Sequence, residues 1–144
     1  MTPVLTSLIA VAGTLLGATL GYVFQRRHAN RAEQRAAVLG FANAITEVIL
    51  NQQDRWHRAD EDPGGPEDLA ARRESHRLRN IARQAMNGVA LHVPTAAVLN
   101  QAETTFRAAS DVHSAPTATE RTVRSTAAHQ SVRAFITLAS QYVR

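Results

Sequence analysis

The chain has 144 residues and a formal net charge of +4, and all 16 of its basic residues are arginines. This length suits one membrane anchor plus one small domain. The absence of cysteine from the sequence excludes disulfides and thiol chemistry, and so modest a charge is not by itself a sign of nucleic-acid binding.

The N-terminal segment is the most informative part of the sequence. Residues 4–24 carry no charge, and a helix of that length measures about 31 Å, close to the roughly 30 Å of a bilayer core. Thr2 suits the N-cap and Pro3 the first turn of such a helix. We therefore expect a transmembrane anchor over residues 1–28 and a helical domain over residues 29–144. A cleaved signal peptide is disfavoured because no basic residue precedes the apolar run, and a buried core helix does not explain the abrupt basic flank.

Arginines flank only one side of this segment. The positive-inside rule places such a flank in the cytoplasm. We predict a single-pass protein of the cell inner (plasma) membrane, with its N-terminus outside and its C-terminal domain cytoplasmic. Arg26 and Arg27 are then placed to contact lipid phosphates. The flanking arginines are Arg26, Arg27, Arg31 and Arg35.

Gly13, Gly17 and Gly21 recur every fourth residue and share one face of the predicted anchor helix. Such a face lets two helix backbones approach closely, so it predicts a homo-oligomer formed in the membrane. The alternative is that glycine is simply common in membrane helices.

The remaining sequence shows helical periodicity and no strand-like alternation. We predict an all-α fold in which the anchor helix continues into an antiparallel bundle of about four helices. The first helix is expected to reach residue 58, and the second to run from Pro66 to residue 88 or 91. The third should begin at Pro94, and the fourth should follow the capping box Thr117-x-x-Glu120.

Apolar residues spaced three and four apart mark the side of each helix that should face the core. Most of them are small, so we expect a thin core that needs a partner or its own oligomer for stability. In chain order they are Val38, Phe41, Ala42, Ile45, Val48, Ile49, Gln52 and Trp56; Leu78, Ile81, Ala82, Ala85, Met86 and Val89; Val98, Ala102, Phe106, Ala109 and Val112; and Val123, Ala127, Phe135, Leu138 and Tyr142.

No motif in the sequence indicates catalysis. Asp54-x-x-His57 is the nearest approach to the Glu-x-x-His pairs of di-iron bundles, and it has no second copy. A metal shared by Asp54, His57 and Glu61 is a weaker interpretation than a solvated helix end. The sequence also lacks a nucleophile elbow and a phosphate-binding glycine loop. We therefore expect no enzyme, no cofactor and no metal.

The second helix carries a basic stripe made of Arg72, His76, Arg79 and Arg83. Three interpretations stay open: a solvated face, a contact with phosphates of lipid or nucleic acid, or pairing with the acidic turn next to it. Nucleic acid has the least support, because no aromatic side chain interleaves with the arginines. The acidic residues of the turn are Asp60, Glu61, Asp62, Glu67 and Asp68.

Trp56 is the only tryptophan in the sequence. It is expected to pack on the core, with a contact to a protein partner as the alternative.

Three sequence features together carry a family resemblance: the start VLTSLIAVAGTLLGATLGYVFQRR, the following RAEQRAA and the turn QQDRWHRADEDPGGP. Over residues 4–66, and more loosely over the Arg-rich second helix, the chain resembles small streptomycete membrane proteins described as similar to KilB, a plasmid-spread protein. The resemblance implies a role at the membrane in passing plasmid DNA within the mycelium, and it implies no catalytic residues.

The predicted function is therefore a membrane-anchored interaction or assembly protein at the cytoplasmic face, accessory to plasmid transfer. The alternatives are a lipid- or nucleic-acid-binding adaptor acting through the Arg-rich helix, and a phage or stress membrane protein. The last alternative needs the helical part outside the cytoplasm, against the arginine flank.

Overall fold

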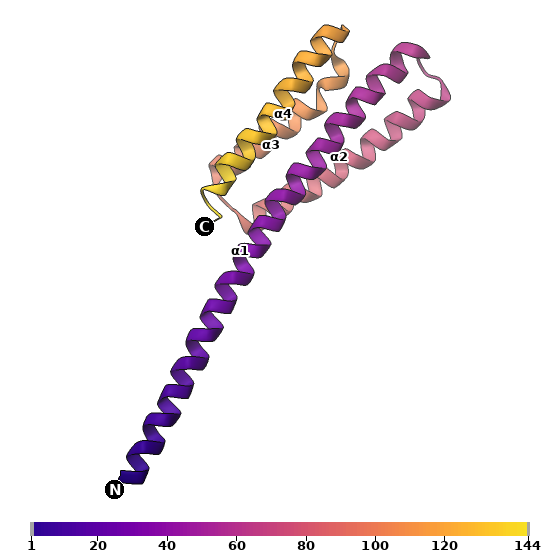
Figure 1. The fold of residues 1–144 in the computed structure, drawn as a ribbon. Helices are drawn as coiled ribbons and strands as arrows, with labels where there is room; N and C mark the ends of the chain where they lie inside the picture. The colour runs from indigo at the N-terminus through magenta and orange to yellow at the C-terminus, as the bar shows by residue number, and fades with distance from the viewer. Residues whose placement is uncertain (1, 144) are drawn as a thin grey trace. The chain divides into compact units, whose positions relative to one another are not determined.

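The computed structural model describes the backbone of residues 2–143 and the side chains of residues 17–143. All of its regular structure is helical (Figure 1), and none of the described residues lies in a strand. The predicted all-α fold with a bundle of four helices is confirmed. The elements are α1 (Thr2–Glu61), α2 (Pro66–His92), α3 (Ala96–Ser110), the short 3₁₀ helix η1 (Val112–Ser114) and α4 (Ala118–Ser140).

The chain divides into two compact units, Met1–Glu33 and Gln34–Arg144. The first consists of the N-terminal part of α1. Over the part of the chain that could be assessed, no helix combines the length and hydropathy needed to cross a bilayer. Most of the predicted span, including Gly13, lies outside the residues whose side chains are described. The anchor over residues 1–28 stays a prediction.

Neighbouring helices of the second unit run antiparallel. Gln34 on α1 donates from Nε2 to the carbonyl oxygen of His92 at 3.1 Å, at the C-terminal end of α2. Further along α1, Gln52 donates from Nε2 to Ser75 Oγ at 2.9 Å. From the first of these bonds to the second, the residue number rises on α1 and falls on α2. The two helices therefore run in opposite directions, as Figure 1 also shows.

The core is made of buried residues from all four helices and η1. The ring centroids of Phe41 on α1 and Phe135 on α4 are 4.9 Å apart, with an edge-to-face interplanar angle of 70°, a favourable aromatic geometry. The predicted core-facing stripe of α1 is confirmed, since all of its members are buried or half-buried. Gln52 is fully buried within this stripe, and its bond to Ser75 satisfies its amide donor.

The buried face predicted for the fourth helix is correct in part. Val123 and Tyr142 are 58% and 45% exposed, and Ala127 is exposed as well. Gln53 of α1 donates to the hydroxyl of Ser125, so a polar residue of α4 faces α1. Phe135 is fully buried and Leu138 is half-buried against the core, as predicted. The other buried residues of α4 are Ser125, Ala128, Val132 and Ala139.

On α2 the prediction that Ile81 faces the core was also wrong, because this residue is 36% exposed.

The turn after α1 is closed by Gly64, whose positive φ of 80° is a conformation that glycine adopts without strain. The next two helices begin at their predicted caps or close to them. Thr95 is the N-cap of α3, one residue after Pro94. Thr117 caps α4, accepting a hydrogen bond from the backbone N–H of Glu120 at 3.1 Å.

Candidate functional site: a basic pocket between α2 and α3

The predicted basic stripe divides into two parts that have different partners. At its N-terminal end Arg72 binds Asp68 one turn earlier, through Nε at 3.1 Å and through a second guanidinium nitrogen at 2.8 Å. The Asp68 side chain is fully covered, and the backbone N–H of Gly64 donates to it at 3.0 Å. Hydrogen bonds from Arg72, followed by that of Gly64, hold the pKa of Asp68 below its ordinary value. Of the three interpretations, pairing with the acidic turn is therefore the one that holds for Arg72.

Arg79 and Arg83 form no ion pair in the part of the chain that the structure describes. Arg79 donates from Nε to the carbonyl oxygen of Ser75 at 3.3 Å, and its terminal nitrogen lies 3.4 Å from His76 Nδ1. The Arg83 guanidinium lies 5.4 Å from the ring centroid of Phe106 on α3, a cation–π distance. None of these partners carries a negative charge.

A pocket of about 320 Å³ opens at these two arginines, a volume at the lower end of the range of ligand pockets. The α2 residues that line it offer hydrogen-bond donors, and α3 contributes one aromatic ring and one hydroxyl. The oxygen of that hydroxyl, Ser110 Oγ, is buried and has no hydrogen-bond partner among the described residues. The lining residues are His76, Arg79, Asn80, Arg83, Phe106 and Ser110.

Two further charged or titratable residues lie near this pocket, and the sequence did not single them out. Arg55 on α1 is half-buried, and burial, followed by repulsion from Arg72 and Arg79, lowers its pKa. His113 in η1 donates from Nδ1 to the carbonyl oxygen of Ser110 at 2.9 Å. Burial is the largest cause of its lowered pKa, with repulsion from Arg55 and Arg79 adding to it.

Charges of both signs act where α1, α2 and η1 meet: the arginines add to the lowering by burial, whereas Asp68 raises the pKa of Arg55 and Asp111 raises that of His113. Arg55, Arg79 and His113 act on one another, and no carboxylate forms an ion pair with either arginine among the described residues. Asp68, a buried carboxylate, already accepts two hydrogen bonds from Arg72. An anion entering the pocket would meet Arg79 and Arg83 without displacing a carboxylate of the described residues from either of them.

Trp56 connects α1 to the segment before α4. Its indole Nε1 donates to the carbonyl oxygen of Ala115 at 2.8 Å, and the Arg121 guanidinium lies 4.5 Å from its ring centroid. The ring is half-buried. These contacts agree with the expected packing role, and the alternative contact with a protein partner stays a prediction.

The predicted residues of the first unit are exposed where they are described. A Cβ added at Gly17 or Gly21 would meet nothing within 4 Å, and Arg26 and Arg27 are exposed. The packing of two anchors through the glycine face, and the contact of these arginines with lipid phosphates, stay predictions.

The three residues considered for a metal do not converge. Asp54 forms an ion pair with Arg58 at 3.4 Å, and the His57 ring stacks edge-on with Trp56 at a centroid distance of 5.5 Å. Over the described residues, no group of three acidic or histidine side chains is placed to hold a metal ion.

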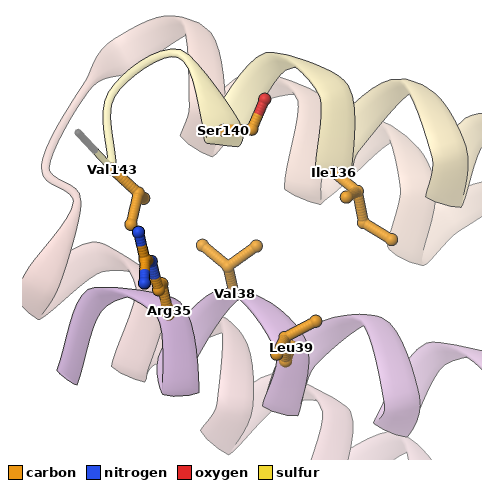
Figure 2. Close-up of a pocket in the computed structure, with 6 residues that line it drawn as sticks. All are labelled: Arg35, Val38, Leu39, Ile136, Ser140 and Val143. Atoms are coloured by element: carbon orange, nitrogen blue, oxygen red, sulfur yellow. The ribbon is translucent and has the colours of Figure 1, made fainter. Parts of the chain in front are cut away.

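A second, mainly apolar pocket of about 310 Å³ lies between α1 and the end of α4. In Figure 2 the side chains of Val38 and Leu39 on α1 face Ile136 on α4, and Arg35 points towards Val143. Sequence periodicity did not predict this pocket, because its walls come from opposite ends of the second unit's sequence. The residues that line it are Arg35, Val38, Leu39, Ile136, Ser140 and Val143.

The fold and the pocket define a small helical-bundle protein with an unpaired basic site on its surface. A family model described as KilB plasmid transfer protein matches residues 35–143, so the chain belongs to the KilB plasmid transfer protein family. The suspected resemblance is thus confirmed, although the match covers the bundle and not the apolar segment at residues 4–24. No curated protein and no solved structure gives a significant match.

Proposed function

We propose that this chain is a membrane-anchored, non-catalytic interaction protein whose bundle serves plasmid transfer at the cytoplasmic face of the membrane. The observation that carries the proposal is the match of the plasmid-transfer family over residues 35–143, which covers almost the whole second unit. The uncharged run at residues 4–24 and the arginines that follow it support the anchor and its orientation.

Plasmid transfer is tested by deleting the gene from a plasmid-bearing host and scoring plasmid spread between donor and recipient mycelium. The full chain should restore spread. A chain with Leu15→Arg and Leu16→Arg should not, because each arginine at the bilayer centre costs roughly 2.5–3.5 kcal/mol. Leu15→Val with Leu16→Val is the matched control and should restore spread. Normal spread in the deletion strain would contradict the role in transfer, and restoration by the arginine variant would contradict the anchor.

Orientation is tested by reporters fused after Arg144. A green fluorescent protein fusion should be bright, and an alkaline phosphatase fusion should be inactive, because the phosphatase folds only outside the cytoplasm. A strongly active phosphatase fusion would reverse the topology and favour the phage or stress membrane protein.

The homo-oligomer is tested in the membrane. Gly17→Ile should weaken self-association in a membrane two-hybrid assay, because a branched side chain holds the two backbones apart. Ala18→Ile, one residue away and off the glycine face, is the control and should leave the signal unchanged. Equal signals from both variants would show that the glycine face is not the contact.

A further inference from the structure

The pocket between α2 and α3 holds hydrogen-bond donors that the described part of the fold leaves unused. Arg79 and Arg83 have no carboxylate partner there, and Asn80 lines the pocket beside them. Ser110 Oγ is buried without a partner, and leaving a buried hydroxyl unsatisfied costs stability. Because Nδ1 of His76 accepts from Arg79 in the neutral tautomer, its Nε2 carries a hydrogen and is a further donor.

This set of donors matches a phosphate group. Guanidinium groups bind phosphate oxygens by charge-assisted hydrogen bonds, which are roughly twice as strong as neutral ones. A hydroxyl and an amide alongside them can satisfy the remaining oxygens. Arg55 lies close enough to Arg79 for their charges to repel, so it adds positive potential without lining the pocket.

The extent of the positive surface limits the size of the ligand. At one end Asp68 neutralises Arg72. At the other end the same face of α2 continues from Arg83 to the uncharged residues Asn87 and Ala90. The unpaired charge on this face is therefore confined to a short stretch of α2, whereas a nucleic-acid backbone or a bilayer surface is bound by several successive cations.

The aromatic ring in the pocket does not offer a stacking surface for a base. Phe106 is only 7% exposed, and Arg83 lies over its ring. Single-stranded nucleic acid is usually bound by stacking on open aromatic rings, and this ring is already covered.

We propose that this pocket binds a small molecule through a terminal phosphate group, held by Arg79 and Arg83 and hydrogen-bonded by Asn80 and Ser110. The ligand ends in a phosphate or pyrophosphate, and the pocket recognises that group and not a base or an acyl chain. The proposal rests neither on the predicted anchor nor on the plasmid-transfer family, although the pocket lies within the residues that the family model matches.

The test is titration calorimetry of the purified full-length chain, in a non-ionic detergent and at low ionic strength, with inorganic phosphate and pyrophosphate as probes. Pyrophosphate should bind more tightly than phosphate, because it carries more charge, and added salt should weaken both. Arg79→Gln and Arg83→Gln should each weaken pyrophosphate binding at least about tenfold.

Arg73→Gln is the matched control. Arg73 is exposed on the same helix, outside the pocket lining, and its substitution changes the net charge by the same amount. It should weaken binding by less than about twofold. Equal losses in the control and the pocket variants would show attraction by net charge alone and would overturn the site.

A variant that fails to fold is recognised by lost helical circular dichroism, and Ser110→Ala then takes its place, because it removes only the hydroxyl. It should weaken pyrophosphate several-fold. No heat of binding with either probe at about 10 mM, a concentration that detects even very weak complexes, would overturn the proposal. Binding of duplex DNA or of anionic phosphatidylglycerol vesicles that pyrophosphate does not displace would also overturn it, in favour of a macromolecular phosphate surface.

Discussion

Arg72 and Arg83 lie on the same face of the same helix, yet their surroundings give them different roles. Arg72 binds a carboxylate that is itself fully covered, so its charge is used within the fold. Arg83 lies over an aromatic ring beside an open pocket, so its charge remains available to a ligand. The comparison shows that the spacing of arginines on a helix does not fix their function. The neighbours that the fold supplies decide it.

Removing the carboxylate that Arg72 binds is the strongest test of this difference between the two arginines. Asp68→Asn should lower the melting temperature by roughly 5–10 °C, because the turn loses an ion pair and a charged acceptor for Gly64 N–H. Thermal unfolding followed by circular dichroism measures the effect. Glu74→Gln removes the exposed partner of Arg77 on the same helix and should change the melting temperature little. Equal effects would contradict the structural role of Asp68.

The pKa of the Asp68 carboxylate also allows a prediction of how stability depends on pH. Its pKa is lower in the folded protein than its ordinary value, so the folded state keeps it ionised at a pH where the unfolded state protonates it. The stabilisation is therefore complete above about pH 5 and is lost as the pH falls below the unfolded pKa of about 3.9. The difference in melting temperature between the wild type and Asp68→Asn should shrink below about pH 4. A constant difference would contradict this prediction.

A reciprocal pair of substitutions should separate the two roles. Arg72→Gln should lower the melting temperature by a few degrees and leave pyrophosphate binding within about twofold, because it removes a partner of Asp68 but no pocket donor. Arg83→Gln should weaken pyrophosphate and change the free energy of unfolding by only about 0.5–1 kcal/mol, the contribution of a cation–π contact. If both variants change the same property, the division of the stripe is wrong.

The smallest effect on stability is expected for Ser110→Ala, and its sign should be opposite to that of the effect on binding. Ser110→Ala removes a buried hydroxyl that has no partner, so stability should stay unchanged or rise by up to about 1 kcal/mol. The same variant should bind pyrophosphate less tightly. Urea unfolding together with calorimetry measures both quantities, and a loss of stability would mean that the hydroxyl has a partner within the fold.

Helix-level features were predictable because they depend on neighbours close in the sequence. The stripe from Val38 to Trp56 follows the helical period, and its large apolar members leave only one face that suits a core. The cap at Thr117 and the turn at Gly64 follow from local backbone chemistry. For the fourth helix the same approach was only partly right, because small residues such as Ser125, Ala128 and Ala139 share its buried side with Phe135, whereas the larger Val123 is exposed.

The sequence by itself determined the all-α class, the break between α1 and α2, the positions of the basic residues and the suspicion of the plasmid-transfer family. Each of these is encoded by residues within one or two helical turns or by overall similarity. Only the tertiary structure decided which arginines are paired, which side of α4 is buried and that Ser110 meets Arg79 and Arg83 in one pocket. Those outcomes depend on residues from different helices, and their distances are set by how the helices pack and not by their separation along the chain.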